Sequence, residues 1–157
     1  MRKQLLALAL IAAGCAAQAA DTPGSNPNVP QVTSADRMAN ARKALAAKDF
    51  GTAQRELNVV VREEPRNADA HNLMGYSYRK RSSPDITKAF EHYYIALRLD
   101  PRHKGAHEYI GQAYLMEKRP AQAEQHLAEL EKICGNKECP EYQELAKAIG
   151  EFKAAAK

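Results

Sequence analysis

Two cysteines near the C-terminus form the first group of residues that could do chemistry. Cys134 and Cys139 bracket four residues, Gly135 to Glu138, that are typical of a turn between two helices. A disulfide here would stabilise the fold by about 2 kcal/mol at most, because the loop it closes is short. The alternative is a redox pair, or a soft-metal site with His126. The spacing is neither CxxC nor the CxxCH of haem attachment, so the structural disulfide is favoured.

Histidines form the second group that could do chemistry. His71 and His107 are 36 residues apart, and His92 and His126 are 34 apart; the fifth histidine is His103. An internal repeat alone produces such spacings. We therefore expect the histidines to pack in the structure rather than to bind a metal.

Motifs of catalysis are missing from the chain. It contains no HExxH pair, no Gly-rich phosphate loop and no GxSxG elbow. No nucleophile, base and orienting group come together in the sequence. We expect a protein that is not an enzyme and that needs no metal and no cofactor.

Charge argues against nucleic acid as a partner. The formal net charge is +4, and it falls to +2 without Arg2 and Lys3, which lie in a segment expected to be removed. Basic and acidic residues are mixed along the chain, whereas a nucleic-acid-binding protein would show a basic stripe.

The N-terminus reads as a secretory signal over residues 1–20. Two basic residues precede a short apolar run, and small residues offer cleavage after Ala19 or Ala20. A periplasmic protein is the expected product. The alternative is a lipoprotein, because the residues before Cys15 resemble a lipobox, and only lipidation there would make a membrane a partner. Residues 21–33 contain Pro23, Pro27 and Pro30 with few apolar side chains to bury, and predict a disordered linker.

The body of the chain repeats a unit of about 34 residues, with two extra residues in the middle copy. The matching residues are Gly75 and Gly111, Tyr78 and Tyr114, Ala89 and Ala123, and Pro65 and Pro101. Each unit predicts two helices, since its apolar residues recur at helical spacing. The first helix of the middle unit is expected over 67–80. The second is expected to start at Ser83-Pro84-Asp85 and to end at Asp100-Pro101.

Small and aromatic residues in this order resemble the tetratricopeptide repeat (TPR) family. The middle copy shows the pattern best, with His71, Met74-Gly75, Tyr78, Ala89, Tyr93, Ala96 and Pro101. The resemblance implies an all-α solenoid of three helix-turn-helix units within 34–139, at about 34–67, 68–103 and 104–137. Residues 140–157 are expected to form a C-terminal capping helix, whose apolar face covers the end of the last repeat.

The resemblance also implies where a partner would bind. The first helices of the units line a concave groove, and residues beside their packing positions should face it. The residues expected there are Arg42, Asn72, Tyr76, Arg79, Glu108 and Gln112. Arg42 and Asn72 could hydrogen-bond an extended peptide, and apolar residues such as Leu45 and Met116 extend the surface.

The sequence therefore predicts a non-catalytic scaffold or adaptor of the bacterial cell envelope that binds an unidentified protein or peptide in its groove. Two alternatives remain open. The first is a thiol- or metal-handling periplasmic protein that uses Cys134 and Cys139. The second is an assembly subunit that packs by the ends of its repeats.

Overall fold

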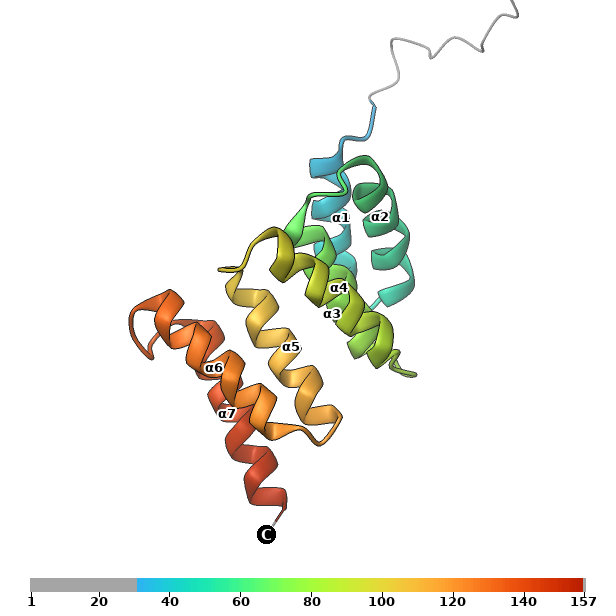
Figure 1. Ribbon diagram of the computed structural model, residues 1–157. Coiled ribbons are helices and arrows are strands. Elements are labelled where there is room, and N and C mark those ends of the chain that lie inside the picture. The colour runs from blue at the N-terminus through green and yellow to red at the C-terminus, as the bar shows by residue number, and fades with distance from the viewer. Residues whose placement is uncertain (1–30, 157) are drawn as a thin grey trace, which may run out of the picture. The chain divides into compact units, whose positions relative to one another are not determined.

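A computed structural model of the chain describes residues 31–156, which form seven helices and no strand (Figure 1). The helices are α1 (Ser34–Ala46), α2 (Phe50–Glu63), α3 (Ala68–Lys80), α4 (Ile86–Leu99), α5 (Lys104–Met116), α6 (Pro120–Cys134) and α7 (Pro140–Ala155). The predicted all-α solenoid is confirmed. The predicted signal, Cys15 and nearly all of the predicted linker lie outside the described residues.

Each of the first five helices begins at a polar residue that caps it. The side chain of the cap accepts a hydrogen bond from the backbone N–H three residues on, which satisfies one of the free donors of the first turn. These caps are Thr33, Asp49, Asn67, Asp85 and His103. The last two helices begin instead with Pro120 and Pro140 in the first turn, where a proline removes no helical hydrogen bond.

The predicted start of α4 at Ser83 is wrong. The cap is Asp85, whose Oδ1 accepts from the backbone N–H of Lys88 at 3.1 Å. The N–H of Asp85 also donates to the carbonyl of Tyr78 at 3.0 Å, which closes the turn after α3. Ser83 and Pro84 therefore belong to that turn, although their residue types suit a helix start.

The two extra residues of the middle repeat lie in the turn between α3 and α4. The turns α1–α2 and α5–α6 have three residues each, whereas residues 81–85 separate α3 from α4. The two short turns share one conformation, with Lys48 at φ 58° and Lys118 at φ 57°. Turn length within a pair thus varies, while the helices keep their register.

Close approach of the paired helices α3 and α4 explains the glycine of the middle repeat. A Cβ on Gly75 would lie 2.6 Å from Cε1 of Tyr93 and 3.0 Å from the carbonyl of Ala89, so α3 and α4 could not pack as they do. On α4, Ala89, Tyr93 and Ala96 are fully buried, and Leu97 beside them is half-buried.

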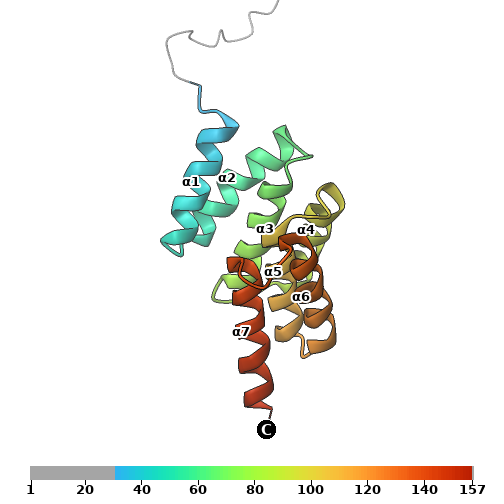
Figure 2. The ribbon, with the colours of Figure 1, turned by 90° about the vertical axis from the view of Figure 1, so that its left-hand side faces the viewer.

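The helices pack in order along the chain, and α7 packs on both α5 and α6 (Figures 1 and 2). Leu145 and Ile149 of α7 are buried in the core formed with α4, α5 and α6. A second core joins α1, α2 and α3. The C-terminal helix therefore covers the apolar end of the last repeat, as an end repeat requires.

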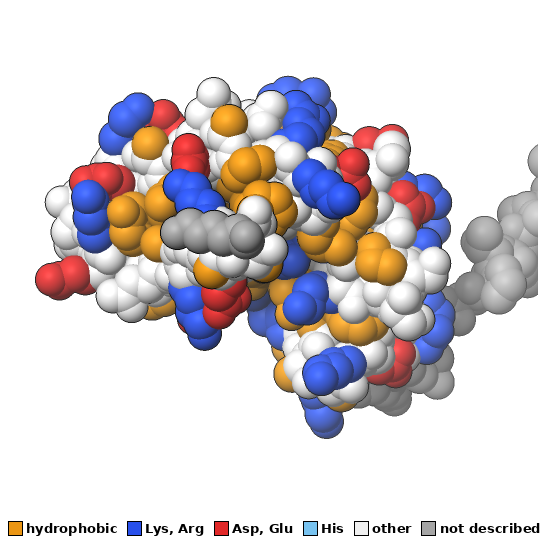
Figure 3. Space-filling view, turned by 90° about the horizontal axis from the view of Figure 1, so that it is seen from below, with side chains coloured by type: hydrophobic (Ala, Val, Ile, Leu, Met, Phe, Trp, Pro, Cys, Tyr) orange, Lys and Arg blue, Asp and Glu red, His pale blue; other side chains and the backbone are white. Residues whose placement is uncertain are grey.

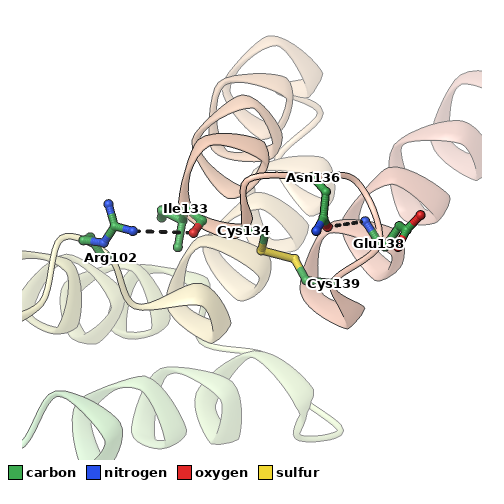
Figure 4. Close-up of a disulfide and its surroundings, with 6 residues drawn as sticks. All are labelled: Arg102, Ile133, Cys134, Asn136, Glu138 and Cys139. Carbon is green, nitrogen blue, oxygen red and sulfur yellow. Dashed lines mark hydrogen bonds between the residues drawn. A yellow bond between two sulfur atoms is a disulfide. The ribbon is translucent and has the colours of Figure 1, made fainter.

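The turn from α6 to α7 brings the two cysteines together. Gly135 ends α6 in the left-handed region, at φ 73°, and Asn136 accepts from the N–H of Glu138 at 2.9 Å. The sulfur atoms of Cys134 and Cys139 lie 2.08 Å apart, at bonding distance (Figure 4). The turn thus accommodates the disulfide, whose formation under oxidising conditions stays a prediction.

Candidate functional site

A groove lies across the first helices of the three repeats. One hollow of about 200 Å³ and an adjoining one of about 390 Å³ share Leu45, Ala46 and Tyr76. The remaining lining residues are Arg42, Leu73 and Tyr109 in the first hollow and Lys48, Phe50 and Lys80 in the second. We call the two hollows together the α1–α3–α5 groove.

The lining combines apolar side chains with positive charge. Leu45, Phe50 and Tyr76 supply the apolar part, and Lys48 and Lys80 are exposed at the same hollow. Seen from below, hydrophobic side chains lie next to Lys and Arg side chains around a hollowed part of the surface (Figure 3). Such a lining suits a partner that offers an apolar side chain beside carboxylates.

Arg42 stands at the edge of the first hollow. Its Nη2 lies 3.6 Å from Oδ2 of Asp69, and its side chain is 54 % exposed. An exposed ion pair of this length contributes little to stability, because water screens it. The guanidinium of Arg42 therefore remains available to the carboxylate of a partner.

Tyrosine rings enclose Arg79 between α3 and α5. The guanidinium carbon of Arg79 lies 5.6 Å from the ring centres of both Tyr76 and Tyr109, within the range of cation–π attraction. Its Nε donates to the hydroxyl of Tyr93 at 3.2 Å. Tyr76 and Tyr109 also contact each other, with 4.9 Å between ring centres. Arg79 thus fixes the two tyrosines that line the groove.

Three of the predicted groove residues are less accessible than the sequence suggested. The exposed fractions are 5 % for Asn72, 5 % for Arg79 and 9 % for Glu108, so these side chains do not face a partner in the way expected. The reason is the close packing of α3 against α5, which encloses the positions beside the packing stripe. Arg42 and Tyr76 do line the groove.

Glu108 and Gln112 form a polar pair on α5. Gln112 donates to Oε1 of Glu108 at 2.9 Å. Burial raises the pKa of Glu108 to about 7, and the nearby charges of Glu141 and Glu144 on α7 act in the same direction. Arg79 opposes them. Glu108 is therefore a carboxyl group that changes charge near neutral pH.

Sequence reasoning missed Tyr109, Phe50 and Lys48 as lining residues. Tyr109 follows Glu108 directly and faces Tyr76 across the α3–α5 contact. Lys48 and Phe50 come from the turn and the start of α2, which repeat spacing does not assign to the groove. The positive φ of Lys48 was not visible in the residue type.

A metal centre finds no support among residues 31–156. These residues contain no group of three or more His, Cys, Asp or Glu side chains placed to hold a metal ion. The sulfur atoms of Cys134 and Cys139 face each other, and His126 contacts His107 instead. In the same part of the chain, no helix has both the length and the apolar character needed to cross a membrane.

Comparison with known proteins supports the repeat architecture. No protein-family model and no curated protein matches the chain. Among solved structures, the chain is similar to the TPR2B domain of yeast Sti1 in its complex with pHsp70, with a TM-score of 0.69. The alignment covers 80 % of this chain and 99 % of that one at 13 % identity. The fold is TPR-like. In this fold α1, α3 and α5 are the first helices of the three repeats, and the groove runs across them.

Proposed function

We propose that this chain is a non-catalytic scaffold that binds a protein or peptide partner in the α1–α3–α5 groove. The observation that carries the proposal is the lining of the two adjoining hollows, where apolar side chains lie beside Arg42, Lys48 and Lys80. A TPR-like solenoid with this lining offers a recognition surface for such a partner.

Charge complementarity selects the partner. The groove carries three cations at its edge, and the aromatic rings of Phe50 and Tyr76 offer an apolar contact between them. We infer an extended peptide segment that places an apolar side chain on these rings and carboxylates against the cations. The structural neighbour was solved in a complex with pHsp70, which agrees with a partner-binding role.

The compartment forms part of the proposal. Residues 1–20 have the charge pattern and small residues of an export signal, so we place the mature protein in the periplasm of the cell envelope. Lipidation at Cys15 is the alternative form.

A displayed peptide library tests the proposal although the partner is unidentified. Random peptides are selected on the mature chain, residues 21–157, and separately on the double variant Lys48→Glu/Lys80→Glu. The groove predicts enrichment of segments with an apolar residue flanked by Asp or Glu on the wild type, and loss of that enrichment on the variant.

Arg62 and Arg66 supply a matched control. Both are exposed, and neither lines the groove. The double variant Arg62→Glu/Arg66→Glu changes the net charge by the same amount and should select the same peptides as the wild type. Identical selection by all three proteins would rule out the groove as the binding site.

A further inference from the structure

Two histidines meet between the helices of the middle repeat. Nδ1 of His71 on α3 lies 3.2 Å from Nδ1 of His92 on α4, and Nε2 of His71 lies 3.2 Å from the carbonyl of Pro65. The carbonyl can only accept, so Nε2 of His71 carries the proton. Nδ1 of the neutral His71 ring then has a free lone pair and accepts from the N–H of His92.

The next repeat contains the same arrangement. Nδ1 of His107 on α5 lies 2.9 Å from Nδ1 of His126 on α6, and Nε2 of His107 lies 3.0 Å from the carbonyl of Pro101. Each pair therefore joins three segments: the turn that precedes a repeat, the first helix of the repeat, and its second helix. One proton lies between the two Nδ1 atoms of each pair.

Neighbouring side chains hold the histidine rings of both pairs in place. His71 and His107 are each 7 % exposed. The ring of Tyr78 stacks on His92, and the ring of Tyr114 stacks on His126, each at 5.7 Å between centres. The rings cannot swing into water without loss of these contacts.

We propose that the two histidine pairs are acid-opened latches, which hold the turn and both helices of a repeat together while neutral and release them when Nδ1 of the first-helix histidine, His71 or His107, also takes up a proton. A proton on Nδ1 of His71 or His107 places two N–H groups against each other across 2.9 to 3.2 Å, whereas a proton on Nε2 of His92 or His126 charges that ring but leaves its Nδ1–H bond in place. Two donors cannot form a hydrogen bond, and two positive rings would repel at that distance.

Burial and nearby charges lower the pKa of the histidines in the first pair. Burial and the positive charge of a protonated His71 lower the pKa of His92 to about 4, and Lys88 acts in the same direction. The pKa of His71 is also lowered, by burial and by Arg98.

The second pair differs in its neighbours. Burial and His107 lower the pKa of His126 to about 4, while Glu129 raises it. The unfolded histidines have a pKa near 6.5, so they take up protons first as the pH falls. The stability that the neutral pairs provide is therefore present above about pH 6.5 and is lost as the pH falls towards 4.

Asparagine in place of the second histidine of each pair should keep the hydrogen bond between the helices and remove its sensitivity to acid. The side-chain amide of Asn stands at the position of Nδ1, donates to a neutral histidine and, after a flip, accepts from a protonated one. The double variant His92→Asn/His126→Asn should therefore fold at pH 7.5 and lose less stability on acidification.

The test compares urea unfolding of the mature chain and the variant between pH 7.5 and 4.5. For the wild type we expect the unfolding equilibrium constant to rise by at least about tenfold through the two pairs, because a histidine pKa that is lower by one in the folded protein changes this constant tenfold. The double variant should show a clearly smaller rise. His103→Asn is the matched control, because His103 belongs to neither pair and Asn is also a good helix cap.

Equal acid sensitivity of the wild type and the double variant would overturn the proposal. So would histidine NMR signals of residues 92 and 126 that titrate near pH 6.5 in the folded protein. If the double variant fails to fold, the NMR titration of the wild type decides alone. None of these readouts depends on a partner in the groove.

Discussion

Gly111 of α5 and Leu145 of α7 approach so closely that a Cβ on the glycine would lie 2.6 Å from Cδ2 of the leucine. The equivalent glycine of the middle repeat, Gly75, meets Tyr93 of its own second helix instead. On the last repeat, α7 thus approaches Gly111 as closely as α4 approaches Gly75 on the middle repeat. This contact seats α7 against α5.

The contact between Gly111 and Leu145 leaves no room for a larger residue at position 111. Gly111→Ala should destabilise the fold by about 1–2 kcal/mol, because overpacking against the fully buried Leu145 outweighs the helix propensity that alanine adds. Urea unfolding followed by circular dichroism measures the change.

Gly150, also on α7, is the control for that prediction. A Cβ there would meet nothing within 4 Å, so Gly150→Ala should stabilise by up to about 1 kcal/mol. Leu145→Ala alone should cost about 2–5 kcal/mol. In that background Gly111→Ala should no longer destabilise. A persistent cost there would show that Leu145 is not the neighbour that matters.

Glu108 should make stability depend on pH in the opposite sense to the histidine pairs. Its pKa is raised to about 7 in the folded protein, so the unfolded chain loses its proton first as the pH rises. The stability of the wild type should therefore fall between about pH 4.5 and 7 through this group. Relative to the wild type, Glu108→Gln should gain stability across that window, measured by urea unfolding at pH 5 and pH 8. A difference that stays constant with pH would contradict the raised pKa.

Reduction should weaken the attachment of α7 to the last repeat. In oxidised protein we expect no free thiol at Cys134 or Cys139, and reductant should destabilise the fold by about 2 kcal/mol at most. The double variant Cys134→Ser/Cys139→Ser should show the reduced stability with and without reductant. Two free thiols in protein purified under oxidising conditions would instead favour the thiol-handling alternative.

The spacing of the repeated residues predicted most of the fold. Gly75 and Ala89 recur as Gly111 and Ala123 because neighbouring helices must approach closely, so their positions predicted where the helices lie and which faces they bury. The predicted start of α4 was wrong, because Ser83 and Pro84 are residue types that suit a helix start as well as Asp85 does. Only the three-dimensional turn shows that Asp85 caps the helix.

The groove was harder to predict, because helical spacing gives the face of a residue but not the rotation between neighbouring repeats. That rotation decides how far α3 and α5 enclose Asn72, Arg79 and Glu108. It also brings Tyr109 to the groove. The histidine spacing was visible in the sequence, but the hydrogen bond from helix to helix was not.

Affinity for a selected peptide shows whether a partner binds in the α1–α3–α5 groove. Calorimetric titration compares one peptide from the library against the wild type, Lys48→Glu/Lys80→Glu and the control Arg62→Glu/Arg66→Glu. We expect the groove variant to bind at least about tenfold more weakly, because two cations at the hollow become anions, and the control to bind like the wild type. Equal dissociation constants for all three proteins would show that the peptide does not bind in the groove.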